Sequence, residues 1–302
     1  MTCKYTASLS KTGAALESSY NTAPVSFSWF GKTQSHEVNQ SNQTQLNRTQ
    51  DLSRETHSID VLQKKFAGTT MWRVQDGTFF LAAFGTLNTT GAGPYTHTFT
   101  TGDDLVSYSM YHEKKGRGTQ SDIIEVATGC KTNEFKLSCQ EGGYLEAENG
   151  LIAKDKATTT QKVFTSSTTT PFRFADIVGG KVTVDGNDLK ITSYEYTRTN
   201  NLSDEQEGEL IYEPCPMELT EALSLGFKLQ GTSARAPFIA GTEVPVVIAW
   251  TRGSDTLTMT HQVVFKEHPE PTGVEGEIEV SATADVRTTT AVLVDSNATY
   301  TF

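Results

Sequence analysis

The sequence predicts an all-β protein, a β-sandwich or barrel that carries short α-helices. Apolar and polar residues alternate in many short runs, and turns rich in Gly, Asp, Asn and Ser separate these runs. No stretch approaches the ~20 apolar residues of a membrane-spanning helix. With 302 residues, of which 36% are hydrophobic and 20% charged, the chain can bury one large core or two ordinary ones.

The clearest strand signal is a β-hairpin between residues 135 and 151. Period two continues on both sides of the short connection Glu141–Gly143, which is typical of a hairpin. Glu146 and Glu148 fall on the face opposite the apolar side chains. Those side chains are Phe135, Leu137, Cys139, Leu145, Ala147 and Leu151.

The N-terminal region predicts a strand and then a polar segment. Val25, Phe27 and Trp29 alternate with polar residues and indicate a first strand. Residues 34–55 are rich in Gln, Asn, Ser and Thr and almost free of apolar residues. We expect them to form either an exposed loop or an arm that reaches a neighbouring subunit.

Two short helices are predicted. Residues 79–84 are an apolar run that follows the candidate caps Asp76 and Thr78 and precedes Gly85. Residues 216–226 place Leu219, Ala222 and Leu223 on one helical face before a terminal Gly.

Extended segments follow each helix, and their similar order predicts two tandem copies of one domain. After the first helix they are 95–101, 105–112, 123–139 and 144–153, and after the second they are 244–251, 256–266, 276–284 and 290–302. We expect a first β domain at 1–157, a Thr-rich linker at 158–171 and a second β domain at 172–302. The second domain should open with a hairpin around Asp185–Asn187, with Val182, Val184, Leu189, Ile191, Tyr194 and Tyr196 as its apolar positions.

The charge balance and the motifs argue against several function classes. A net charge of −11 argues against a protein that grips nucleic acid through its phosphates. No metalloprotease, nucleophile-elbow or phosphate-loop motif is present, so we predict no catalytic, cofactor-binding or metal-binding residues. His97 and His261 fall in predicted strands as ordinary sheet residues. A catalytic carboxylate pair such as Glu146 and Glu148 is the alternative to a solvated acidic face.

The four cysteines, Cys3, Cys130, Cys139 and Cys215, form no CxxC pair and match no zinc spacing. We expect reduced, mostly buried thiols, with a Cys130–Cys139 bridge as the alternative.

The segment from Tyr95 to Asp155 resembles the tail tube proteins of long-tailed, non-contractile (siphovirus-type) phages. The similarity lies in the PYTHTFT strand, the GCK at Gly129–Lys131 and the LSCQEGGYLEAE run that follows. The resemblance implies an all-β tail tube fold and a structural, non-enzymatic virion protein that self-assembles into stacked rings. The rings would form the channel for DNA delivery. With two domains per chain, a trimer with pseudo-sixfold rings is favoured over a hexamer.

The resemblance also implies partners and surfaces. The partners are further copies of the chain, the tape-measure, distal tail and tail-terminator proteins, and genomic DNA in passage without specific binding. We expect no cofactor, no membrane insertion, synthesis in the host cytoplasm and a place in the virion tail. We expect Glu146, Glu148, Glu277 and Glu279 to line the lumen. For contacts between rings, the candidates are His36, Asn42, Arg48, Lys114, Lys115 and Arg117.

A soluble β-sandwich binding module, carbohydrate-binding or adhesin-like, is the competing function, and an enzyme ranks third. Such a module would be expected to carry a cluster of exposed aromatic residues and to stay small at high concentration. Self-association therefore separates the two classes.

Overall fold

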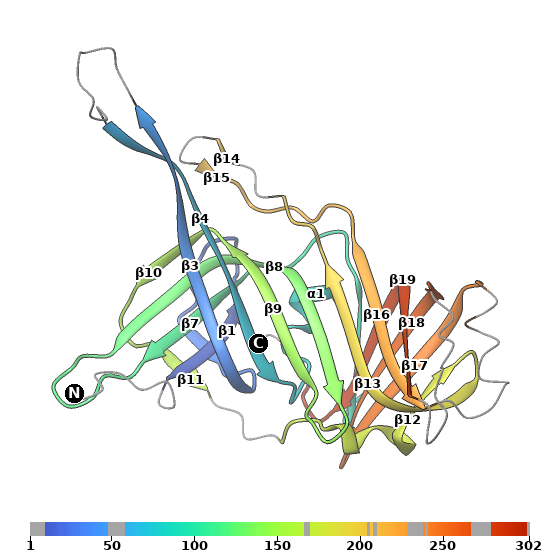
Figure 1. The fold of residues 1–302 in the computed structure, drawn as a ribbon. Coiled ribbons are helices and arrows are strands. Elements are labelled where there is room, and N and C mark those ends of the chain that lie inside the picture. The colour runs from blue at the N-terminus through green and yellow to red at the C-terminus, as the bar shows by residue number, and fades with distance from the viewer. Residues whose placement is uncertain are drawn as a thin grey trace.

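The chain folds almost entirely into β-strands in a computed structural model (Figure 1). The structure describes residues 10–47, 58–165, 170–203, 206–207, 210–228, 238, 241–266 and 279–300. The expectation of an all-β fold is confirmed. Within these residues, no helix is both long and apolar enough to cross a membrane.

The elements of the first half are β1 (Lys11–Leu16), β2 (Ser26–Ser28), β3 (Lys32–Asn47), β4 (Ser58–Arg73), α1 (Phe80–Phe84), β5 (Gly85–Thr90), β6 (Tyr95–Thr101), β7 (Tyr108–Lys114), β8 (Ile123–Gln140), β9 (Glu146–Ala153), β10 (Asp155–Thr158) and β11 (Val163–Thr165). The elements of the second half are two 3-10 turns, η2 (Phe174–Asp176) and η3 (Val178–Gly180), then β12 (Lys181–Val184), β13 (Asn187–Thr199), β14 (Gln206–Glu207), β15 (Leu210–Ile211), β16 (Thr220–Lys228), β17 (Val244–Arg252), β18 (Asp255–Phe265) and β19 (Glu279–Asp295).

The first half is built around β8, which takes part in two layers. The N-terminal part of β8 pairs with β7 and β10, and β7 continues the layer through β1 to β2 and β11. The C-terminal part of β8 pairs with β9, which leads to β4 and β3. The predicted β8–β9 hairpin is confirmed, with Leu137 opposite Ala147 and Lys136 opposite Glu148.

The second half closes into a six-stranded barrel. Its strands pair in the order β13-β16-β19-β18-β17-β12, and β12 pairs back onto β13. The predicted β12–β13 hairpin is confirmed, and Asp185 (φ 48°) and Gly186 (φ 75°) form its tight turn. Tyr194, Trp250 and Met259 are at most 1% exposed inside the barrel.

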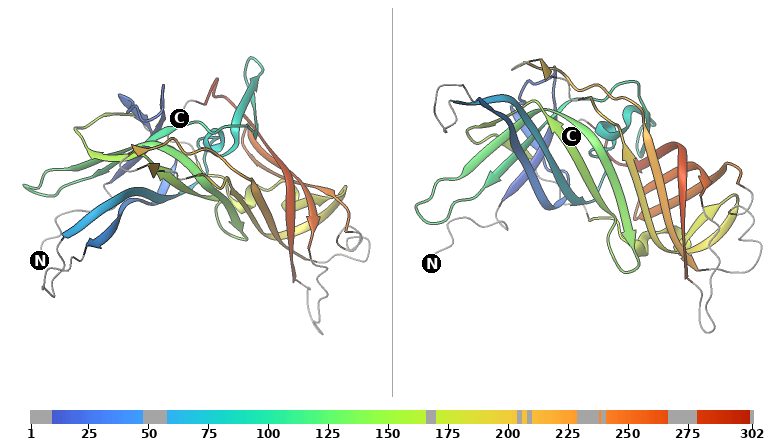
Figure 2. Two further views of the ribbon diagram at one scale, coloured as in Figure 1. Left: turned by 90° about the horizontal axis from the view of Figure 1, so that it is seen from above. Right: turned by 45° about the horizontal axis from the view of Figure 1, so that its top comes forward.

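The two halves share one sheet. β13 of the barrel pairs with β8 over seven positions, from Ser193 opposite Gln140 to Thr199 opposite Glu134. The β5–β6 hairpin of the first half pairs with the end of β19. Seen from above, the halves extend to the two sides of the region that holds α1 (Figure 2). The division into domains at 1–157 and 172–302 stays a prediction.

The predicted first helix is confirmed as α1, a single buried turn. Phe80 and Phe84 are fully buried and contact the ring of Phe135 on β8. Gly85 ends the helix at φ 92°, in the left-handed region that a glycine adopts without strain. Neither candidate cap works as predicted, since the N-cap position is Phe79 and no side chain caps the helix.

The predicted second helix at 216–226 is wrong, because this segment contains the start of β16. Glu221, Leu223, Leu225 and Phe227 alternate inward, with Ala222 exposed between them. β16 lies between β13 and β19 and pairs with both. The period-two pattern and two neighbouring strands outweigh the intrinsic helix propensity of Leu, Ala and Glu.

Three other segments differ from expectation. The predicted strands at 276–284 and 290–302 are one strand, β19, and the chain leaves it before Tyr300. The first strand of the structure is β1, which the sequence did not indicate, and Val25 lies outside β2 with 80% of its surface exposed. Within the predicted linker, Val163–Thr165 form β11, which pairs in parallel with β2.

Candidate functional site

One face of the shared sheet is exposed over six adjacent strands, and we call it the polar face. It lies on the side of the sheet opposite α1, because the side chains that contact α1, such as Phe135, point the other way. The polar face consists of Thr69, Met71 and Arg73 on β4, Glu146, Glu148 and Gly150 on β9, Glu134, Lys136 and Ser138 on β8, Glu195, Thr197 and Thr199 on β13, Ala222 and Ser224 on β16, and Ser281, Thr283 and Asp285 on β19.

The polar face is acidic and rich in hydroxyl groups. It carries five carboxylates (Glu134, Glu146, Glu148, Glu195, Asp285) and two cations (Arg73, Lys136), and a further cation, Lys266, lies 2.6 Å from Asp285 at its edge. Both cations lie beside carboxylates of the same face, with Lys136 Nζ 3.0 Å from Glu195 and Arg73 Nε 3.8 Å from Glu146. Each cation would therefore have to leave its carboxylate before it could bind a phosphate. The face as a whole repels polyanions.

The structure brings together two of the four residues predicted to line a lumen. Glu146 and Glu148 alternate along β9 on the polar face, and the amide of Gln34 donates a 2.5 Å hydrogen bond to Glu146. Glu279 begins β19 in register with Lys228 on β16. Glu277 lies outside the described residues.

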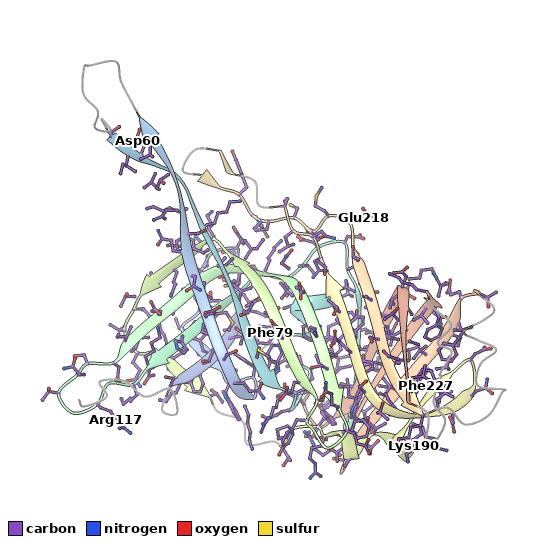
Figure 3. All side chains as sticks on the ribbon, viewed as in Figure 1. Asp60, Phe79, Arg117, Lys190, Glu218 and Phe227 are labelled. Carbon is purple, nitrogen blue, oxygen red and sulfur yellow. The ribbon has the colours of Figure 1, made fainter. Side chains whose placement is uncertain are left out.

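The predicted polar loop at 34–55 is a long antiparallel hairpin, β3–β4, over the part of it that the structure describes. Its distal part, around Asp60, extends beyond the body of the molecule (Figure 3). We call residues 39–47 and 58–65 the arm. Asn42 is exposed on the arm and accepts a hydrogen bond from Gln40. Arg48 lies outside the described residues.

At the base of the arm, β3 contacts β7, β8 and β10 around a cavity of about 70 Å³. The rings of His36 and His112 lie 4.9 Å apart in its wall. Lys156 donates a hydrogen bond to the carbonyl oxygen of Val38 and lies 3.1 Å from Glu125. The cavity thus unites His36 and Lys114, two of the predicted contact residues, in one pocket at the base of the arm.

Both histidines of this pocket favour the neutral form. Burial, the neighbouring His112 and the positive charges of Lys156 and Lys114 together lower the pKa of His36 to about 3. Burial and Lys114 lower the pKa of His112 to about 4. Each ring is held through Nδ1, at 2.8 Å from Thr70 Oγ1 for His36 and 3.0 Å from Thr12 Oγ1 for His112.

The predicted basic tip is a loop after β7. Lys115 Nζ lies 2.5 Å from Asp122, and Lys114 Nζ lies 3.6 Å from Glu125. Arg117 is exposed at the end of this loop (Figure 3) and has no ion-pair partner among the residues that the structure describes. Two of the three positive charges are therefore already paired within the subunit.

A buried ion pair within the barrel, which the sequence did not predict, is linked to the first half through Arg198. Arg198 Nη1 donates a 2.6 Å hydrogen bond to Glu221, and Arg198 Nε donates to the carbonyl oxygen of Ala83 in α1. Tyr196 donates to the same carboxylate. The sequence could have indicated it by position, because Arg198 follows Tyr194 and Tyr196 at intervals of two residues and so points inward with them.

The described residues therefore offer a flat acidic face, a projecting arm and buried polar clusters that hold the halves together. Across the ranges that the structure covers, no three His, Cys, Asp or Glu side chains gather as a metal site would require. Comparison of the sequence with known families matches residues 7–289 to a family described as phage tail tube protein. No curated protein matches the chain.

Proposed function

The chain belongs to the phage tail tube protein family, a family of structural virion proteins, and we propose that its rings stack into the tube of a long, non-contractile tail. The tube would be the channel through which the genome leaves the virion. Synthesis would take place in the host cytoplasm. The tape-measure, distal tail and tail-terminator proteins are the proposed partners at the inside and the ends of the tube.

The observation that carries this proposal is the polar face, which we assign to the lumen. A channel for DNA must not retain the duplex, and contacts from Lys or Arg to phosphates would retain it by releasing counterions. The polar face has five carboxylates against two cations, and Lys136 lies 3.0 Å from Glu195. A genome would therefore pass this wall without binding.

Three copies per ring are proposed. Each half of the chain has one long strand that changes partners along its length: β8 turns from β7 and β10 to β9 and β13, and β19 changes from β16 to β6 on one edge while β18 pairs along the other. This internal similarity supports two related units per chain, so three chains would supply six units around a ring. A hexamer of the whole chain is the alternative.

We propose that lateral closure of the ring uses open sheet edges. Among the described strands, β3 pairs only with β4, so beyond Val38, whose carbonyl oxygen accepts a hydrogen bond from Lys156, its other edge is open to another chain. Pairing of such an edge with a neighbouring subunit would continue the sheet around the channel and give a closed cyclic assembly.

Contacts between rings are proposed for the arm and the basic tip. The arm projects away from the body, and Arg117 lies at the end of its loop (Figure 3). Of the candidate contact residues, Asn42 and Arg117 are exposed and suited to this role, whereas His36 faces the pocket at the base of the arm.

Electron microscopy of negatively stained protein across a concentration series tests the proposal. We expect rings at intermediate and tubes at high concentration, and a ring mass of three times 33.0 kDa for the trimer. A ring mass of six times this value would exclude the trimer. Protein that remains monomeric at every concentration would contradict self-assembly and favour a binding module.

A further inference from the structure

Among the described residues, the large hydrophobic side chains that are exposed, except Val264 on β18, lie toward two opposite ends of the subunit. At the upper end of Figure 1, they lie on the arm and in the segment between β15 and β16. At the lower end they lie beside β2, on β11 and in η3 before β12. The upper set is Leu46, Ile59, Val61, Tyr212 and Met217, and the lower set is Val25, Val163 and Val178.

The arm residues of the upper set form one continuous patch. Leu46 on β3 lies directly opposite Ile59 on β4, and Val61 follows Ile59 by two positions on the same face of the strand. Ile59 is 64% exposed and Leu46 55% exposed. Nothing in the described part of the chain covers this patch.

Two residues of the lower set, Val25 and Val163, lie on neighbouring segments of the chain. Ser26 on β2 is in register with Val163 on β11, and Val25 directly precedes Ser26, so both valines lie at the start of this strand pair. Val163 is 67% exposed and Val25 is 80% exposed. β11 pairs only with β2 among the described strands, so this end of the layer is also open.

Charge does not oppose contact between the two ends. Residues 39–47 of β3 contain no charged side chain, and neither do residues 18–28 around β2. The nearest charged residues along the chain, Asp60 between Ile59 and Val61 and Lys162 beside Val163, have opposite signs. A subunit with two different, compatible surfaces at opposite ends is suited to a head-to-tail contact that repeats without closing.

We infer that the apolar patch of the arm docks onto the Val25–Val163 patch of a second copy of this chain in the next ring. The inference rests on the proposed function and specifies the chemistry of ring stacking as apolar. Burial of these side chains then drives tube growth, and ion pairs of the basic tip contribute little.

Substitutions at the two ends, with a matched control, test this docking. The arm variant is Ile59→Thr with Val61→Thr, and the lower-end variant is Val25→Thr with Val163→Thr. Threonine keeps the β propensity of each strand and removes apolar surface. The control is Val264→Thr, because Val264 is exposed on β18 and belongs to neither set. We expect rings but no tubes from either double variant, with about a tenfold loss of stacking affinity per substitution, and normal tubes from the control.

Mixing the two double variants distinguishes a head-to-tail contact from a general loss of solubility or folding. Rings of the arm variant keep the lower patch, and rings of the lower-end variant keep the arm patch. The mixture should therefore give pairs of rings that grow no further. In wild-type protein, ammonium sulfate should lengthen the tubes, since it strengthens apolar association, whereas stacking by ion pairs would weaken with added sodium chloride.

The possible failures are distinguishable. Wild-type protein that never forms rings would overturn both the proposed function and this inference. Tubes from both double variants that equal those of wild type would overturn this inference alone. Equal loss of tubes in Val264→Thr, or no paired rings in the mixture, would also overturn it.

Discussion

Arg198 and Glu221 form an ion pair in which both side chains are about 1% exposed, with Nη1 2.6 Å from Oε1. The same guanidinium donates to the carbonyl oxygen of Ala83 and lies 4.7 Å from the centre of the Phe84 ring. β13 and β16 of the barrel are thereby attached to the helix of the first half. The pair therefore lies where the two halves meet, alongside the β8–β13 strand pairing.

Replacement of Arg198 by Leu should strongly destabilise the protein. The carboxylate of Glu221 would stay buried without its cation, which typically costs 3–5 kcal/mol of unfolding free energy. We expect the double variant Arg198→Leu with Glu221→Leu to recover part of that loss, because it leaves no unpaired charge. Urea unfolding, followed by circular dichroism, measures both.

The matched control for this pair is the exposed contact between Arg287 and Glu243, whose closest distance is 2.7 Å. Arg287 is 64% exposed, so Arg287→Leu should change stability by less than about 1 kcal/mol. An equal loss in Arg198→Leu and Arg287→Leu would show that burial of the first pair has no special effect.

Local patterns predicted the strands, and tertiary contacts decided the exceptions. The β8–β9 and β12–β13 hairpins followed from period two and a short turn, which are local signals. The segment at 216–226 failed because Leu219, Ala222 and Leu223 also fit a helix, and only pairing with β13 and β19 selects the strand. Long-range register is not visible in one sequence.

In the candidate site, too, local patterns were predictable and long-range contacts were not. Glu146 and Glu148 were placed on one solvent face by alternation alone. The pocket of His36 and His112 was not predicted, because the two residues are far apart in sequence and meet only when β3 crosses β7. Polar composition indicated an exposed segment at 34–55 but did not separate a loop from a hairpin, since Gln, Asn and Thr occur in both.

Acid should destabilise the subunit through its buried histidines. Burial lowers the pKa of His36 to about 3, that of His112 to about 4 and that of His261 to about 3, against 6.5 in the unfolded chain. The unfolded state therefore binds more protons than the folded state below pH 6.5. The contribution of these histidines to the free energy of unfolding is fully present above that pH and is lost as the pH falls toward 4. For each fully buried histidine, the free energy of unfolding then changes by up to about 1.4 kcal/mol per pH unit.

Urea midpoints between pH 7.5 and pH 4.5 measure this effect. His261→Gln should flatten the profile most, since the ring of His261 is fully buried between Tyr194 and Thr289. His57→Gln supplies the comparison at a residue outside the described ones. A profile that His261→Gln leaves unchanged would mean that carboxylates, not histidines, set the acid sensitivity.

Replacement of Gly68 by Ala should loosen the base of the arm. Gly68 lies opposite Val38, and an added Cβ would overlap the carbonyl oxygen of Glu37 on β3. Separation of β3 from β4 at this point should cost about 1–3 kcal/mol. Hydrogen exchange of the β3 amides should accelerate.

Gly150→Ala is the control for this prediction. Gly150 also lies within a paired strand, but the nearest atom to an added Cβ is the side-chain Cβ of Glu134 at 3.3 Å, not a backbone oxygen. A small relaxation accommodates that contact. Equal acceleration of exchange in both variants would show that the close approach at Gly68 is not what sets the strand spacing.

Reversal of charge on the polar face should convert a surface that repels DNA into one that retains it. Glu148 and Glu195 lie on β9 and β13, and both flank Lys136 of β8, which is opposite Glu148 in the sheet and 3.0 Å from Glu195. Glu148→Lys with Glu195→Lys would free this cation and add two more, so assembled tubes should bind double-stranded DNA with an affinity that falls steeply with salt. Fluorescence anisotropy of labelled duplexes measures the binding.

Glu148→Gln with Glu195→Gln removes the charges without adding a phosphate contact and should give little retention. Asp155→Lys, on β10 outside the six strands of the polar face, should leave DNA passage unchanged; if it retained DNA as strongly as the double lysine variant, net charge would explain the effect and the polar face would not be the lumen.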